Sequence, residues 1–365
     1  MAHHHFLKNL FFFFLLTHLN IFSFNLSKAQ MVPAVYVFGD SLVDVGNNNY
    51  LPISITKADF PHNGIDFPNR IPTGRFSNGK NTADFLAEKV GLPTSPPYLS
   101  RILGNNEGSF LTGVNFASGG AGIFNGTDEK YQQSIPLTQQ VEYYSMVHEE
   151  LIQQMGYSDV QNHSSKSLFV IVIGSNDIFD YFGSSDLRKK SNPQQYVDLM
   201  AITLQGPIKQ LYNTGARKFV VAGLAQIGCS PTQRVKNQTG KCNEEINYWS
   251  RKYNQGLKTI MQDLKSELNG MSYSYFDTFS VMQNAIQNPA SYGLTEIKSA
   301  CCGLGTLMAM VPCLPIATYC SNRGDHLFWD PYHPTEATAR FFVDAIFDGP
   351  LNYTSPMNVR QLIAV

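Results

Sequence analysis

Short apolar runs alternate along the chain with longer segments whose apolar residues recur at helical spacing. The short runs are rich in β-branched and aromatic residues and end in glycine or polar residues, which is typical of buried strands in a parallel sheet. These predicted strands lie at residues 34–39, 113–123, 167–173, 217–223 and 272–276. Helices are predicted at residues 81–90, 137–155, 193–214, 243–268 and 335–347.

Strands that alternate with helices predict one parallel sheet, covered on both faces and joined by right-handed crossovers. In such sheets, ligands bind beyond the carboxyl ends of the strands. Polar residues that directly follow a predicted strand are therefore the first candidates for a functional site. A long loop at residues 47–78, rich in Asn, Pro and Gly, follows the first strand and is expected to help build that site.

Ser41 stands just beyond the Gly39–Asp40 pair that ends the first predicted strand. A serine hydroxyl becomes a good nucleophile only when a neighbouring base removes its proton and a third group orients that base. Without such partners, Ser41 would merely cap a turn or a helix. The rest of the chain must therefore supply a base and an orienting group.

His333 is the predicted base, because it follows Asp330 by three residues on a turn that also holds Pro331 and Pro334. Asp330 can bind one imidazole nitrogen and fix the tautomer, which leaves the other nitrogen to face Ser41. A structural turn with an incidental histidine is the alternative. Surface positions are expected for His62, His148 and His163, while His326 lacks the same local carboxylate although it follows Asp325.

Two more segments after predicted strands can donate hydrogen bonds to a ligand. Glycines cluster at residues 119–122, where backbone N–H groups can approach a ligand closely, and Asn176 follows the strand at 167–173. A tight turn and a helix cap are the alternatives for these two segments. The glycine cluster lacks the spacing of a dinucleotide site, and no nucleotide phosphate loop occurs.

Residues 1–29 are predicted to be a secretory signal peptide and residues 30–365 a single domain. The leader has a weakly basic start, an apolar run at 10–16 and a small-x-small pattern at 27–29. As a membrane anchor it would need about 20 apolar residues, and polar residues interrupt the run sooner. We therefore expect a secreted protein of the extracellular space or cell wall, without a transmembrane segment.

The cysteines suit an oxidising compartment, since all six lie in the second half of the chain. We favour a local pairing of Cys229 with Cys242, with Cys301, Cys302, Cys313 and Cys320 closed among themselves. No metal site is predicted, because no Cys-x-x-Cys pair occurs and adjacent cysteines make poor joint ligands. Asparagines in glycosylation motifs are Asn125, Asn162, Asn237 and Asn352.

Charge argues against nucleic acid as a partner. Only 15% of the residues are charged and the formal net charge is −1. Proteins that bind nucleic acid usually carry a basic stripe, and this sequence has none.

Taken together, these segments resemble four blocks of the GDSL, or SGNH, hydrolase superfamily, and specifically its secreted plant esterase/lipase branch. The blocks are residues 39–42 (GDSL), 115–122, 174–177 (GSND) and 330–334, and they occur in the same order. Each motif is weak alone, but four in order are specific, and the resemblance covers residues 32–350. It implies a flavodoxin-like three-layer α/β/α sandwich with a five-stranded parallel sheet.

The resemblance also implies roles for individual residues. Ser41 would be the nucleophile, His333 the general base and acid, and Asp330 its orienting carboxylate. The oxyanion hole would combine the Ser41 N–H, a glycine N–H, for which we choose Gly119 over Gly120, and the Asn176 side chain. No cofactor is needed for this chemistry.

The favoured function is therefore a secreted serine esterase or lipase that acts on carboxylic esters of lipids, acylated small molecules or polysaccharides. An acyltransferase or a polysaccharide deacetylase would use the same triad. A catalytically silent lipid- or glycan-binding protein is the alternative from another class, and the intact catalytic residues argue against it.

Overall fold

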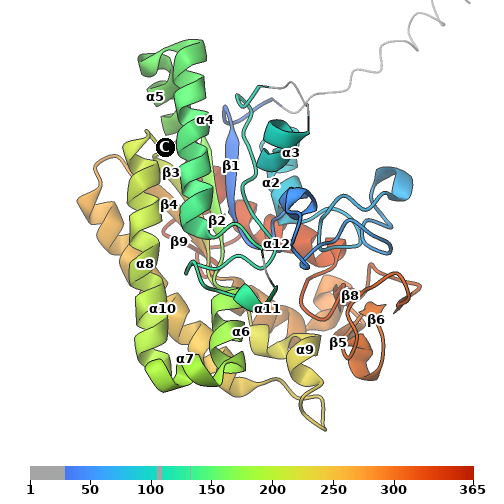
Figure 1. Cartoon of the computed structure of the whole chain (residues 1–365). Coiled ribbons are helices and arrows are strands. Elements are labelled where there is room, and N and C mark those ends of the chain that lie inside the picture. Colours follow the sequence, from blue (N-terminus) through green and yellow to red (C-terminus); the bar gives the residue numbers. More distant parts are fainter. Residues whose placement is uncertain (1–28, 105–108, 132) are drawn as a thin grey trace, which may run out of the picture.

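The computed structural model describes residues 29–104, 109–131 and 133–365 (Figure 1). The predicted signal peptide, apart from Ala29, lies outside the described residues. Within the described part of the chain, no helix combines the length and the apolar character needed to cross a membrane.

A five-stranded sheet forms the centre of the molecule, in the order β1-β2-β3-β4-β9. The first four strands pair in parallel, as expected from their apolar runs. Their bounds are Val35–Gly39 for β1, Leu168–Val172 for β2, Lys218–Ala222 for β3 and Ser272–Phe276 for β4. The α/β class predicted from the sequence is confirmed.

The fifth strand differs from the prediction. It is β9, Thr354–Ser355, which pairs antiparallel with the outer edge of β4. The predicted strand at 113–123 instead runs along the free edge of β1, where Asn115 forms one parallel bridge with Val37. Backbone hydrogen bonds extend this pairing, such as Val37 N–H to Val114 O at 3.0 Å and Phe116 N–H to Val37 O at 2.7 Å. This segment leads into the glycine cluster.

Alternate side chains of each strand face two different hydrophobic cores. One core contains the aromatic residues of β1 and β2, such as Tyr36 and Phe169, and is covered by α4, α8 and α10. The other contains valines such as Val37 and Val170 and is covered by α2, α11, α12 and α13. The molecule therefore has three layers (Figure 1).

The predicted helices occur close to their expected ends. They are α2 (Thr82–Lys89), α4 (Leu137–Met155), α8 (Pro193–Asn213), α10 (Glu244–Glu267) and α12 (Glu336–Asp348). At the start of α2, the Asn81 side chain accepts from the Ala83 and Asp84 N–H groups while Asp84 accepts from the Asn81 N–H. This reciprocal capping fixes the first turn of the helix.

The structure adds helices that the sequence pattern did not predict. Longer ones are α5 (Tyr157–Lys166), α6 (Ser175–Gly183) and α11 (Thr278–Gln287). Shorter ones are α3 (Tyr98–Leu103), α7 (Ser185–Lys190), α9 (Pro231–Arg234) and α13 (Val359–Ala364). Most of them are polar or short, so their apolar periodicity is weak.

Two small sheets lie in the cysteine-rich region after residue 295. Strand β5 (Glu296–Ala300) pairs in parallel with β8 (His326–Phe328), and β6 (Cys302–Gly303) pairs antiparallel with β7 (Thr318–Tyr319). This region packs beside the long loop that follows β1 (Figure 1). The indole N–H of Trp329, for example, donates to Asn63 Oδ1 at 3.0 Å.

Candidate active site

The end of β1 is shaped so that Ser41 lies at the carboxyl edge of the sheet. A Cβ atom on Gly39 would lie 2.2 Å from the Val172 carbonyl oxygen, so only glycine allows β1 to approach β2 this closely. The Asp40 N–H then donates to that same carbonyl at 3.1 Å, and the Asp40 carbonyl accepts from Val43 and Asp44. Ser41 therefore sits in a turn that the backbone holds firmly.

The structure brings Ser41, His333 and Asp330 together, although Ser41 and His333 lie 292 positions apart in the sequence. His333 Nε2 lies 2.7 Å from Ser41 Oγ, and His333 Nδ1 lies 2.7 Å from Asp330 Oδ2. A carboxylate at Nδ1 favours the tautomer that carries its proton there. The Nε2 atom is then able to accept the serine proton.

Asp330 is itself fixed by the turn that carries His333. Its Oδ1 atom accepts the backbone N–H groups of Tyr332 and His333, each at 2.8 Å. The turn is closed by the Trp329 N–H, which donates to the His333 carbonyl at 2.8 Å. The imidazole also packs against Phe76 of the long loop, with ring centroids 4.9 Å apart. All three catalytic candidates are largely buried, which limits their freedom.

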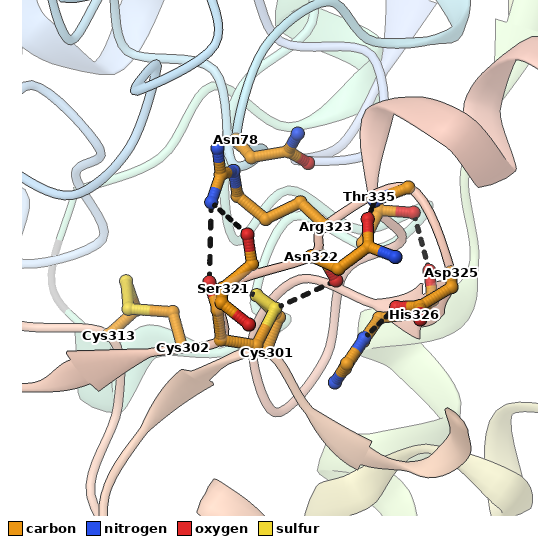
Figure 2. The surroundings of a disulfide bond; sticks show 12 residues. Asn78, Cys301, Cys302, Cys313, Ser321, Asn322, Arg323, Asp325, His326 and Thr335 are labelled. Carbon is orange, nitrogen blue, oxygen red and sulfur yellow. Dashed lines mark hydrogen bonds and ion pairs between the residues drawn. A yellow bond between two sulfur atoms is a disulfide. The ribbon is translucent and has the colours of Figure 1, made fainter. Parts of the chain in front are cut away.

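Two disulfides close the loop that is hydrogen-bonded to the residues leading into this turn. The predicted pairing is confirmed: Cys229 is bonded to Cys242, and the other four cysteines form the bridges Cys301–Cys320 and Cys302–Cys313. The N–H groups of Cys301 and Cys302 donate to the carbonyls of Phe328 and Trp329 at 3.0 and 2.6 Å. The bridged loop is thus hydrogen-bonded to the residues directly before Asp330. Figure 2 shows the surroundings of these bridges, with Cys301, Cys302 and Cys313.

The glycine cluster approaches Ser41, but the chosen glycine does not fit the expected role. The Gly119 N–H donates to Asp44 Oδ2 at 3.1 Å, so this donor is already used within the protein. Gly120 has a φ of 82°, which favours glycine, and it lines the same cavity as Ser41. Because Asp44 accepts the hydrogen bond of the Gly119 N–H, this geometry favours Gly120 over Gly119 as the glycine donor.

Asn176 also lines this cavity. Its side-chain nitrogen donates to the Ala121 carbonyl at 2.9 Å, which orients the amide. An amide group carries two hydrogens, and the second remains for a ligand. Neighbouring Asp177 accepts from the Ile123 and Phe124 N–H groups and from the Thr127 hydroxyl, so it ties the glycine-rich loop to the start of α6.

Two buried carboxyl groups beside Ser41 were not singled out from the sequence. Burial raises the pKa of Asp40 to about 7 and the pKa of Asp44 to about 6. Hydrogen bonds from Gly46, Asn47 and Gly119 oppose the shift at Asp44, whereas Asp40 accepts mainly from the Leu42 N–H at 3.0 Å. The only available signal was that both aspartates flank Ser41 in the sequence.

The other histidines lie apart from this arrangement. His62 bonds to the Ala317 carbonyl at 3.0 Å, and His326 Nδ1 lies 2.7 Å from Asp325 Oδ1 (Figure 2). His163 lies near the Tyr36 hydroxyl and is partly buried. The surface position predicted for His148 is wrong: this residue is only 5% exposed, and burial lowers its pKa.

A cavity of about 540 Å³ opens at the candidate catalytic residues. Ser41, His333, Gly120 and Asn176 all contribute to its wall. This volume falls in the usual range for small-molecule sites. The arrangement can therefore position an acyl carbonyl between a nucleophile with its base and a set of hydrogen-bond donors.

Comparison with known proteins supports the chemistry that this geometry allows. A profile described as GDSL-like lipase/acylhydrolase matches residues 35–346. The chain is 55% identical over 344 residues to GDSL esterase/lipase At5g55050 of Arabidopsis thaliana, covering 92% of this chain and 91% of that protein. It is 37% identical over 341 residues to GDSL esterase/lipase 7 of the same plant, covering 91% and 92% of the two chains.

Proposed function

The chain belongs to the GDSL-like lipase/acylhydrolase family of carboxylic ester hydrolases, and from this premise we propose that it cleaves esters through an acyl-enzyme on Ser41. The observation that carries the proposal is the hydrogen-bonded series from Asp330 through His333 to Ser41, with 2.7 Å at each step. A serine hydroxyl in this arrangement is activated for attack on an acyl carbonyl.

In the first half-reaction, Ser41 Oγ forms a bond to the acyl carbon while its proton moves to His333 Nε2. The carbonyl oxygen takes the negative charge, and the N–H groups of Ser41 and Gly120 with the Asn176 amide would stabilise it. Collapse of this intermediate breaks the ester bond, and His333 gives its proton to the departing alcohol. Each oxyanion donor of this kind commonly contributes a factor of about 10²–10³ to kcat.

In the second half-reaction, water replaces the alcohol. His333 removes a proton from the water, the hydroxide attacks the acyl carbon, and the free acid leaves as Ser41 regains its proton. Asp330 keeps the imidazole oriented and balances its positive charge in both halves. If an alcohol entered instead of water, the same steps would transfer the acyl group.

The proposal includes action outside the cell, in the extracellular space or cell wall. Three disulfides fit passage through the secretory pathway. The four asparagines in glycosylation motifs, Asn125, Asn162, Asn237 and Asn352, are all exposed, which a glycan would require. Glycan release from the secreted protein, followed by mass spectrometry, tests the occupancy of these four sites.

Hydrolysis of p-nitrophenyl acetate and butyrate by the secreted protein tests the proposed function. We expect multiple turnovers by the native chain and a loss of at least about 10³-fold in kcat for Ser41→Ala. Glycerol or a sugar added as an acyl acceptor separates hydrolysis from transfer. Equal background rates for both chains would contradict the proposal and favour a protein that binds lipids or glycans without cleaving them.

A further inference from the structure

The cavity at Ser41 extends to both sides of the catalytic residues, and its two halves differ in polarity. Towards α6 and α9 its wall includes charged and polar side chains, among them Asp128, Lys130, Gln233 and Lys236. Towards α2 and α12 it enters the layer between the sheet and these helices, where the wall is mostly apolar. Apolar residues of the other core, Ile173, Leu224 and Ile227, also line the first half, so its wall is mixed in character. Away from the catalytic candidates, the described residues that line the second half carry no charged side chain.

This second half, which we call the acyl slot, has a regular wall on α12. Thr338, Phe342 and Ile346 follow one another at intervals of four residues and so lie on one face of the helix. At a rise of about 1.5 Å per residue, this stripe is about 12 Å long. The hydroxyl of Thr338 donates to the Leu327 carbonyl at 2.9 Å, so its polar atom is satisfied within the protein.

The opposite wall of the acyl slot comes from the sheet and α2. Val170 of β2 and Val220 and Ala222 of β3 point to this side, and Ala83 and Leu86 of α2 complete the wall. All five side chains are at most 9% exposed. A slot closed by such residues is a poor place for a polar alcohol or a sugar, because a buried polar group without hydrogen bonds is costly.

We propose that the acyl slot binds the apolar chain of the substrate, so that the preferred substrates are esters of medium- or long-chain acids with a polar alcohol. This inference rests on the proposed function, since it requires the acyl carbonyl to lie at Ser41. The alcohol then occupies the polar half of the cavity beside α6 and α9. Each methylene group taken out of water contributes up to about fourfold to kcat/KM.

Rates with p-nitrophenyl acetate, butyrate, octanoate and palmitate test this inference. For the native chain, we expect kcat/KM to rise from acetate to octanoate by roughly two- to fourfold per methylene. Ala222→Leu fills the slot, and the octanoate-to-acetate ratio is expected to fall at least tenfold. Ile346→Ala lengthens the slot, so the preference is expected to move towards palmitate.

Matched controls lie in the other hydrophobic core. Ala201 and Ile260 are 3% and 8% exposed and do not line the cavity. Ala201→Leu and Ile260→Ala therefore test overpacking and a new void without touching the slot, and both should keep the octanoate-to-acetate ratio within about twofold. These ratios remain interpretable even where a variant is less stable.

Two results would overturn the inference. One is an unchanged chain-length profile in both Ala222→Leu and Ile346→Ala, and the other is an equal change in the slot variants and their controls. Failure of the proposed function is a separate outcome, because it would abolish turnover of acetate by the native chain as well.

Discussion

Asp330 connects the backbone of the turn at residues 329–333 to the imidazole of His333. One carboxyl oxygen accepts two backbone N–H groups and the other faces His333 Nδ1. The tautomer of His333 and the negative charge that faces its ring therefore both depend on the Asp330 side chain. An amide of the same shape would keep much of the turn but would present an N–H₂ group to Nδ1 in one of its two orientations.

Asp330→Asn should lower kcat by about 10²–10⁴-fold, because the imidazole loses its orienting negative charge. Steady-state kinetics with p-nitrophenyl butyrate measure this loss, and the melting temperature should change by only a few degrees. Asp325→Asn is the matched control, since Asp325 binds His326 Nδ1 at 2.7 Å in the same manner. A similar loss of kcat in both variants would contradict the role given to Asp330.

Asp40 is a second carboxyl group at this turn, and its effect should appear in stability. Burial raises its pKa from 3.8 to about 7, and nearby Asp177 adds to the rise, whereas the Leu42 N–H and His333 lower it. Its Oδ2 atom has no hydrogen-bond partner among the described residues. The folded chain therefore binds this proton more tightly than the unfolded chain does.

The contribution of Asp40 to stability is full below about pH 4 and is lost as the pH rises through about 7. An asparagine does not titrate, so Asp40→Asn does not suffer this loss. The difference in free energy of unfolding between the variant and the native chain should therefore grow in favour of the variant from pH 4.5 to 7.5. The difference should reach up to about 4 kcal/mol, at about 1.4 kcal/mol per pKa unit. Urea unfolding of both chains at several pH values measures this difference. A difference that stays constant with pH would show that folding does not raise the pKa of Asp40.

Among the elements, the long loop after β1 is joined to α2 by a buried ion pair. Arg75 Nε and Nη2 donate to the two oxygens of Asp84 at 2.8 and 2.7 Å, and both side chains are buried. The same loop carries Phe76, which packs on His333. The position of His333, the proposed base, is thus linked to the contact between this loop and α2.

Arg75→Met should cost about 3–5 kcal/mol in the free energy of unfolding, because it leaves the Asp84 carboxylate buried without its cation. Arg360→Met provides the control, since Arg360 pairs with Asp348 at the surface and both side chains are largely exposed. Exposed pairs typically contribute less than about 1 kcal/mol. Urea unfolding should therefore separate the two variants clearly, and equal losses would argue against a special role for the buried pair.

The disulfide-bridged region should affect both stability and catalysis. Loss of the Cys302–Cys313 bridge in a Cys302→Ala/Cys313→Ala double variant should lower stability by about 2–4 kcal/mol. It should also lower kcat, because the Cys302 N–H binds the carbonyl of Trp329, directly before Asp330.

The Cys229–Cys242 bridge offers a control of similar span, with a sequence separation of 13 against 11. Its removal should lower the melting temperature with a smaller effect on kcat, measured below the transition of either variant. A larger loss of kcat in this control would show that the bridge at Cys302 does not position the catalytic turn.

At the scale of the whole molecule, the features that the sequence predicted correctly are those that depend on periodicity and local spacing. The apolar runs predicted β1 to β4, and the spacing of Asp330 and His333 predicted their hydrogen bond. Strand β9 has only two residues, so it carries no alternation that could be recognised. The segment at 113–123 has the apolar character of a strand, but it only follows the edge of β1.

Other features depend on contacts between distant segments, which a local pattern cannot reveal. At the glycine cluster, for example, the Gly119 N–H donates to Asp44, which lies 75 positions earlier in the sequence. The choice between Gly119 and Gly120 as a donor to a ligand therefore depends on a distant residue. His148 is a different case, because it lies four residues after Tyr144 and three before Leu151, both buried in α4. Helical spacing alone therefore places His148 on the buried face of α4.

The central claim is an acyl-enzyme on Ser41, and its most direct test is the mass of that intermediate. The secreted protein would be mixed rapidly with p-nitrophenyl butyrate, quenched in acid, digested and analysed by mass spectrometry. We predict a butyryl group on the peptide that contains Ser41, together with a burst of one p-nitrophenol per active chain where deacylation is slower than acylation. A native chain that turns over the ester while Ser41 stays unmodified, or a Ser41→Ala chain that retains the native rate, would contradict the account.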